Sequence, residues 1–220
     1  MNPRLSWLVC LFLLLPGALP AAAQRFSYGV KAGVPITGFL GTPTSQNSPY
    51  PLYKASINRY AAGGTVELHL PFGFGIEIDG IYRHYGYSNG PYTSDKTSTG
   101  DWEFPILAKY RLPGKSVRPY VDAGISVDTL SGTTQTESLA LLATQGRLVT
   151  TTTSDPIEFN ESTTTGFVAG AGIDVRIRPL HIQPEVRYTR WSDRHFQDPG
   201  SPHYLLGKLD QVESLAGIAF

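Results

Sequence analysis

Apolar and polar residues alternate along most of the chain. Eight windows show this period of two, with the bounds 26–34, 60–70, 74–84, 102–111, 120–128, 166–176, 180–190 and 210–220. Such alternation predicts β-strands, because successive side chains of a strand point to opposite faces. From residue 24 onward, no window of ten or more residues has a convincing helical period. The pattern therefore predicts an all-β fold whose strands each have one apolar and one polar face.

The connections between these windows alternate strictly between long and short. They hold 25, 3, 17, 8, 37, 3 and 19 residues. This asymmetry is typical of outer-membrane barrels, which have short periplasmic turns and long outward loops. Most windows also have about the ~9–11 residues that a tilted strand needs to cross a bilayer. We predict an eight-stranded antiparallel up-and-down transmembrane β-barrel with both termini in the periplasm.

The apolar face comprises 40 positions, none of which is charged. Its aromatic residues gather near the strand ends, and Val, Ile, Leu, Ala and Gly fill most of the middle. Two aromatic rims around an aliphatic belt match the girdles of a membrane barrel. The girdle residues that we predict are Tyr28, Tyr60, Phe74, Tyr82, Trp102, Tyr110, Tyr188 and Phe220.

The opposite face carries charged residues interspersed with glycines. An eight-stranded barrel has an interior just wide enough for side chains, and forty apolar side chains would overfill it. We therefore expect the charged face inside, although a soluble ligand-carrying barrel would turn its apolar face inward. Because an unpaired buried charge costs several kcal/mol, acids and bases should pair across strands. Besides Asp128, the predicted lumen charges are Lys31, Glu67, Glu77, Asp79, Arg83, Glu103, Lys109, Arg111, Asp122, Asp174, Arg176, Glu185, Arg187 and Glu213.

Composition agrees with this interpretation. The 220 residues include 18 Lys+Arg and 18 Asp+Glu, and this balance argues against nucleic acid as a partner. Charged residues make up 16%, whereas soluble domains contain about 25%. One strand face without any charge accounts for the low fraction.

The N-terminus has the features of a secretory signal peptide. Arg4 precedes an apolar stretch at 5–15, and 21–23 supplies the small residues that a signal peptidase reads. We predict a signal peptide at 1–23 and a mature barrel domain at 24–220. A membrane anchor is the alternative, but the stretch is shorter than the ~20 residues that span a bilayer. Cys10 lies in this segment, which leaves the mature chain no cysteine for a disulfide or a zinc site.

Several strand motifs resemble the bacterial outer-membrane β-barrel ("porin family") domain. They are residues 102–111 (WEFPILAKYR), 118–124 (RPYVDAG), 170–175 (GAGIDV), 184–188 (PEVRY) and 217–220 (GIAF). The family includes OmpA- and OmpX-like barrels of the Gram-negative cell envelope, and it implies a fold but no single activity. The terminal Phe220 resembles the signal read by the barrel-assembly machinery. The resemblance implies outer-membrane lipid and, during insertion, that machinery as partners.

The loops and the lumen suggest possible roles. The Thr-rich flanks of 129–165 favour extension of strands 120–128 and 166–176 into a protruding hairpin. With the loop at 35–59, it could bind an extracellular protein or surface ligand, for example by strand addition, or it could be a solvated loop. The charged lumen is predicted to be a polar plug, with a narrow ion or solute channel as the alternative. We expect a structural or surface-interaction role and no large stable pore.

A catalytic role finds little support in the sequence. Asp193, Arg194 and His195 form the best local cluster, near other loop residues (His84, Asp198 and His203). A hydrolase would need a nucleophile within reach of such a histidine, and no Ser stands beside them in a recognisable pattern. We therefore predict no enzyme and no cofactor, with a lipid- or peptide-hydrolysing barrel as the less favoured alternative. A metal site formed by His69 and His181 is an even less favoured hypothesis.

Overall fold

The computed structural model describes seven stretches of the chain. They are residues 26–38, 52–90, 95–140, 148–153, 161–177, 179–195 and 207–220. The predicted signal peptide at 1–23 lies outside them. Among the described residues, no helix is long and apolar enough to cross a membrane.

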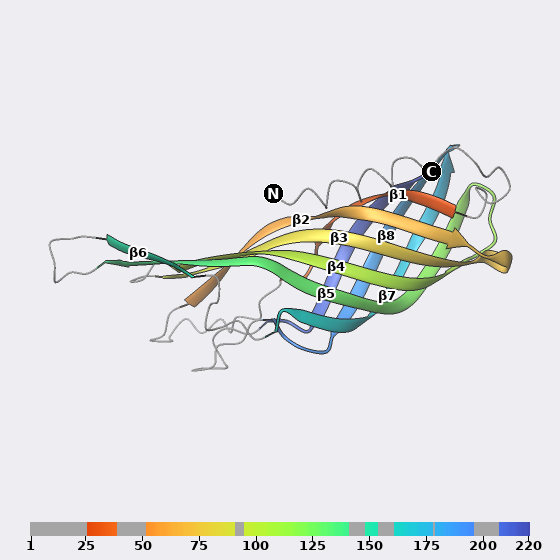
Figure 1. Ribbon diagram of the computed structural model, residues 1–220. Coiled ribbons are helices and arrows are strands. Elements are labelled where there is room, and N and C mark those ends of the chain that lie inside the picture. Colours follow the sequence, from red (N-terminus) through yellow and green to blue (C-terminus); the bar gives the residue numbers. More distant parts are fainter. Residues whose placement is uncertain are drawn as a thin grey trace, which may run out of the picture.

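Nearly all described residues belong to antiparallel strands (Figure 1). The strands are β1 (Phe26–Pro35), β2 (Leu52–His69), β3 (Phe74–Gly90), β4 (Asp95–Arg111), β5 (Val117–Ala140), β6 (Leu148–Thr153), β7 (Thr163–Ile177), β8 (Leu180–Trp191) and β9 (Asp210–Ala219). The sheet order is β4-β3-β2-β1-β9-β8-β7-β5-β6, and a further β4–β5 pairing closes the ring. The predicted eight-stranded antiparallel barrel is therefore confirmed, with β6 as an additional strand outside the ring.

Short turns gather at one end of the barrel, which we call the turn end. They lie between β2 and β3, between β4 and β5, and between β7 and β8. The first holds a 3-10 turn, η1 (Pro71–Gly73), in which Phe72 and Gly73 have positive φ angles of 63° and 86°. Phe220 lies at the same end, where its backbone N–H donates a hydrogen bond to the Tyr28 carbonyl. We call the opposite end of the barrel the loop end.

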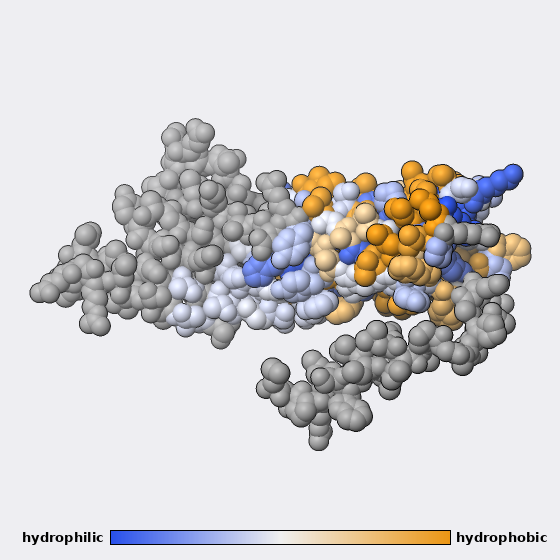
Figure 2. Space-filling model, turned by 90° about the horizontal axis from the view of Figure 1, so that it is seen from above, coloured by the Kyte–Doolittle hydropathy of each residue, from blue (hydrophilic) through white to orange (hydrophobic). Residues whose placement is uncertain are grey.

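The two faces of the strands have the predicted orientation. Along β8, exposed and buried residues alternate from Ile182 to Trp191, and β7 alternates likewise from Thr163 to Ala169. The exposed positions are mostly apolar and the buried positions mostly polar. Figure 2 shows hydrophobic residues gathered over the barrel, whereas the protruding part carries polar ones. This inside-out burial is what a barrel surrounded by lipid requires.

At the loop end, the sheet continues past the barrel as a protrusion, and here the structure corrects the predicted strand ends. β3 continues to Gly90 and β4 begins at Asp95, so most of the predicted 85–101 loop is strand. β2 likewise begins at Leu52, inside the predicted 35–59 loop. Alternation could not reveal these extensions, because outside the membrane neither face of a strand needs to be apolar.

The predicted protruding hairpin is present, and its returning strand is described in two parts, β6 and β7. β5 runs on to Ala140; it pairs with β7 up to Thr129, and farther out Gln135–Ala140 pair with Leu148–Thr153 of β6. On its other edge, β5 pairs with β4 in the same region. Figure 1 shows β6 at the far end of the protrusion, away from the C-terminus. The protrusion is therefore a continuous multi-stranded sheet and not an isolated hairpin.

Candidate functional site: the charged lumen and its two ends

The predicted lumen charges converge inside the barrel. Thirteen of the fourteen are buried, together with Asp128. Arg176 is the exception and is exposed, because β7 reaches the turn end just beyond it. Some lumen-facing glycines make room for long charged side chains. At Gly75, for example, an added Cβ would lie 2.6 Å from Glu67 Oε1.

At mid-height, the central cluster joins strands from across the barrel. Glu77 of β3 accepts hydrogen bonds from both Lys31 of β1 and Lys109 of β4. Arg187 of β8 donates to Asp79 at 2.8 Å and to Glu185 at 2.7 Å. Because strands β1, β3, β4 and β8 all contribute, the cluster bridges the lumen instead of lining one wall.

Tyr120 completes this cluster, although the sequence analysis did not single it out. Its hydroxyl donates to Glu185 at 3.1 Å, and Lys109 Nζ lies 4.3 Å from the centre of its ring. The sequence feature that could have identified Tyr120 is its place on the inward face of the predicted strand 120–128, in phase with Asp122. Asp122, two residues along, is buried, and neither of its carboxylate oxygens has a hydrogen-bond partner in the described part. The expected pairing of acids and bases therefore does not extend to Asp122.

Nearer the loop end, a single guanidinium holds several acids. Arg83 donates to Glu213 at 2.7 Å through Nε and at 2.6 Å through Nη2, and also to Glu103. Asp101 lies 3.5 Å from Arg83 Nη1, and Ser126 donates to Glu103 at 2.9 Å. We call this set the Arg83 cluster. Its members have side-chain exposures of 0–1% apart from Ser126, whose residue is likewise buried.

At the turn end, a third group contains more basic than acidic residues. Glu67 accepts a bidentate pair of hydrogen bonds from Arg111. Asp174 accepts from Arg118 at 2.8 Å and contacts His181 Nδ1 at 2.9 Å. Arg118 and His181 were not among the predicted lumen charges.

The predicted loop cluster of Asp193, Arg194 and His195 does not form a triad. His195 Nε2 lies 3.0 Å from Asp128 Oδ2, and its Nδ1 lies 2.7 Å from the Glu161 carbonyl oxygen. Asp193 instead exchanges backbone hydrogen bonds with the Thr164 hydroxyl. Since both ring nitrogens of His195 face oxygen atoms, neither is left to activate a hydroxyl nucleophile. Asp198 and His203 lie outside the described residues.

Among the described residues, no group of three or more His, Cys, Asp or Glu could hold a metal ion. The two histidines considered as a metal pair have other contacts. His69 Nε2 lies 3.1 Å from the Ser27 hydroxyl, and His181 contacts Asp174. Nothing in this arrangement points to a metal bound between them.

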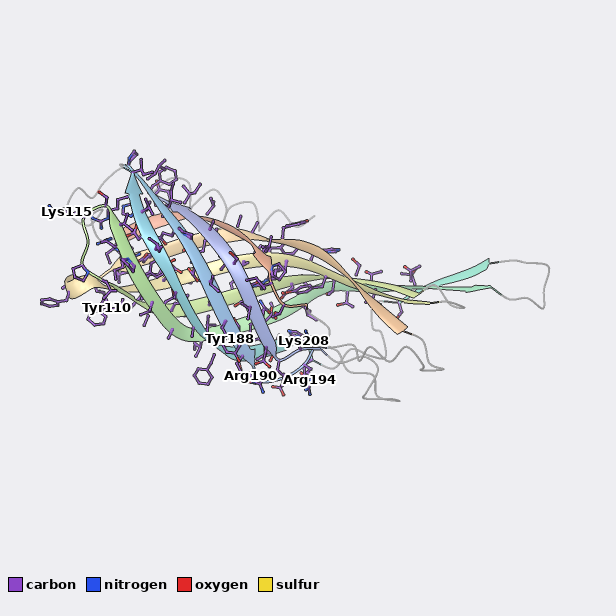
Figure 3. All side chains as sticks on the ribbon, turned by 180° about the vertical axis from the view of Figure 1, so that it is seen from behind. Tyr110, Lys115, Tyr188, Arg190, Arg194 and Lys208 are labelled. Carbon is purple, nitrogen blue, oxygen red and sulfur yellow. The ribbon has the colours of Figure 1, made fainter. Side chains whose placement is uncertain are left out.

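The aromatic residues form contacts at both ends of the barrel. At the turn end, the rings of Phe74 and Tyr110 lie 4.9 Å apart, and those of Tyr28 and Phe220 6.2 Å apart. At the loop end, the rings of Tyr82 and Trp102 lie 5.1 Å apart. All eight predicted girdle residues are at least partly exposed, as contact with lipid would require. Figure 3 shows Tyr110 and Tyr188 at opposite ends of the barrel.

A model of the outer membrane protein beta-barrel domain matches residues 21–190. The chain belongs to this family. Its members are outer-membrane barrels, so the protein is a bacterial outer-membrane β-barrel, as the strand motifs implied. No match to a curated protein was found.

This barrel is similar to several solved structures of small outer-membrane proteins. Neisserial surface protein A is 16% identical, with a TM-score of 0.41 and coverage of 88% of this chain and 95% of that one. OprG from Pseudomonas aeruginosa is 14% identical, with a TM-score of 0.47 and coverage of 88% and 92%. Ail of Yersinia pestis, the attachment invasion locus protein, is 11% identical, with a TM-score of 0.40 and coverage of 89% and 97%.

Proposed function

We propose that this outer-membrane barrel acts at the cell surface through its protrusion, while its lumen is plugged. The observation that carries the proposal is the length of β5. Its 24 residues far exceed the ~9–11 that cross a bilayer. From Thr129, which pairs with Trp102 of the loop-end girdle, β5 continues to Ala140, a reach of roughly 35 Å at about 3.3 Å per residue.

The protrusion offers strand edges for recognition. In the described part of the chain, residues 52–57 pair only with β3, and β6 pairs only with β5. A sheet edge of this kind can accept an extended segment of another protein through main-chain hydrogen bonds. We therefore propose an extracellular protein segment, bound as an added strand, as the partner. With the protrusion outside the cell, the turn end and both termini face the periplasm.

A shortened protrusion tests this proposal. Replacing residues 137–151 with Asn-Gly joins Thr136 to Thr152, which are paired across β5 and β6, through a two-residue hairpin turn. Displayed random peptides would be selected on the wild-type barrel in nanodiscs and then tested on the shortened one. We expect peptides that bind the wild type and lose at least tenfold in affinity for the shortened barrel. Peptides that bind both barrels equally, or none that bind, would contradict the proposal.

The contacts inside the barrel also support a plugged lumen. Lys31 reaches Glu77, Asp79 and Glu185, which belong to two other strands, so its side chain spans the interior. We expect planar-bilayer recordings of the purified barrel to show no stable large conductance, because eight strands with filled interiors leave little continuous water. A porin of known conductance, reconstituted in the same way, is the control. A stable large single-channel conductance would favour the channel alternative instead.

A further inference from the structure

His195 lies at the loop-end mouth of the barrel, in the short segment that follows β8. We call this segment, residues 192–195, the strap. The imidazole reaches inward, where Nε2 lies 3.0 Å from Oδ2 of Asp128 on β5. On its other side, Nδ1 lies 2.7 Å from the carbonyl oxygen of Glu161, just before β7. The side chains of His195 and Asp128 are each only 6% exposed, so their contact is buried.

The strap is also tied to β7 by hydrogen bonds that do not titrate. The Ser192 N–H donates to the Thr165 carbonyl at 2.8 Å, and the Asp193 N–H donates to the Thr164 hydroxyl at 3.2 Å. These bonds join the strap to β7, whereas His195 joins it to β5. Any change in the state of His195 therefore acts on the link between the strap and β5.

The two contacts of His195 together require two protons. A backbone carbonyl oxygen only accepts hydrogen bonds, so Nδ1 must carry a hydrogen to bind Glu161. The contact with Asp128 joins an imidazole nitrogen to a carboxyl oxygen, and one of these two atoms must carry the second hydrogen. Without that hydrogen, two acceptors face each other at 3.0 Å in a buried place, which is costly.

The surroundings of the pair do not oppose the second proton. The neighbouring Arg83 cluster contains three carboxyl groups and one guanidinium, so its formal charge is negative. The pair also borders a cavity of about 30 Å³, which is large enough for a water molecule that exchanges protons with the solvent. Figure 3 shows Lys208 at this end of the barrel. The titratable or charged side chains that line the same cavity are Tyr85, Asp193, Lys208 and Asp210.

We propose that His195 and Asp128 form a proton-dependent latch, which holds the strap across the loop-end mouth of the lumen and releases it when the pair loses its second proton. The closed latch binds one proton more than the open latch, so a rise in pH favours the open form. Because Asp128 neighbours the Arg83 cluster, opening gives water access to those buried charges. The latch does not depend on the partner proposed for the protrusion, so either proposal can fail without the other.

Amide hydrogen exchange, followed by mass spectrometry on the full barrel in nanodiscs, tests the latch. Exchange would be compared from about pH 5 to about pH 9, a range that includes the usual titration of histidine, after correction for the intrinsic rate. In the wild type, we expect protection of the Ser192 and Asp193 amides to fall about tenfold as pH rises, since a hydrogen bond to a charged group is typically worth that much. Protection that does not change with pH would overturn the latch.

Asp128→Asn separates the latch from the proton that operates it. The new side-chain amide donates to Nε2 of a neutral His195, while Nδ1–H still donates to Glu161. Both contacts then persist without a titrating proton, so protection of the strap should change less than about twofold with pH. His195→Ala removes both contacts and should leave the strap weakly protected at every pH.

His84→Ala is the matched control. His84 is a second histidine at the loop end, but its Nε2 lies 2.9 Å from the Ser98 hydroxyl, which can donate or accept. This variant should keep the wild-type pH dependence of the strap. A pH dependence that persists in Asp128→Asn or in His195→Ala would contradict the proposal. Gel mobility before and after heating verifies folding, and if one of these two variants does not fold, the other and the wild type decide.

Discussion

Replacing Arg83 with methionine should destabilise the barrel by about 3–5 kcal/mol, the usual cost of removing one partner from a buried ion pair. Arg83 is 1% exposed and contacts Glu103, Glu213 and Asp101. Without the guanidinium, these carboxylates would face one another in a space from which water is excluded. Urea unfolding in phospholipid vesicles, followed by tryptophan fluorescence, would measure the change.

Two comparisons separate the electrostatic cause from lost packing. Adding Glu103→Gln and Glu213→Gln to the Arg83 variant should recover most of the loss, because the buried charges go together. Arg190→Met should have little effect. Arg190 pairs with Asp210 at 2.5 Å, but both side chains are about half exposed. If Arg83→Met proved as stable as the wild type, or if the triple variant were no better than the single one, the Arg83 cluster would not have this role.

The alternation of residues was enough to predict the barrel, because lipid on one side and a narrow lumen on the other impose opposite demands on neighbouring residues. It also separated inward from outward residues: Arg83 and Glu103 are buried, and Phe104 is exposed. The protruding ends of β2, β3 and β4 escaped prediction because water lies outside the membrane and exerts no such demand. β6, with the sequence LVTTTT, shows no period of two, and only its threonines pointed to a strand.

The partners of each charge could not be predicted in the same way. Arg83 of β3 reaches Glu213 of β9, 130 positions away in the chain. Such a contact depends on how the staggered strands bring residues to one height, which local sequence does not determine. His195 illustrates the same limit. The sequence placed it beside Asp193, but the fold brings it to Asp128, 67 positions earlier.

Neighbouring glycines in β2 should respond in opposite ways to alanine. Gly63 faces the lumen, and a Cβ there would lie 1.9 Å from the Gly80 carbonyl oxygen of β3. No side-chain rotation relieves a contact with backbone, so β2 and β3 would have to separate. We expect Gly63→Ala to cost roughly 2–3 kcal/mol, or to prevent barrel closure altogether. The retained compact form on unheated gels and urea unfolding in vesicles would measure both outcomes.

Gly64, the next residue, provides the control. It faces outward, where the nearest atom to an added Cβ is the Gly29 carbonyl oxygen at 3.9 Å, an ordinary contact distance. Gly64→Ala should therefore fold like the wild type, and could gain stability slightly because alanine loses less backbone entropy on folding. If both variants were destabilised alike, the effect would reflect the chemistry of the strand and not the close approach of β2 to β3. If neither were destabilised, the two strands would have room to spare at this point.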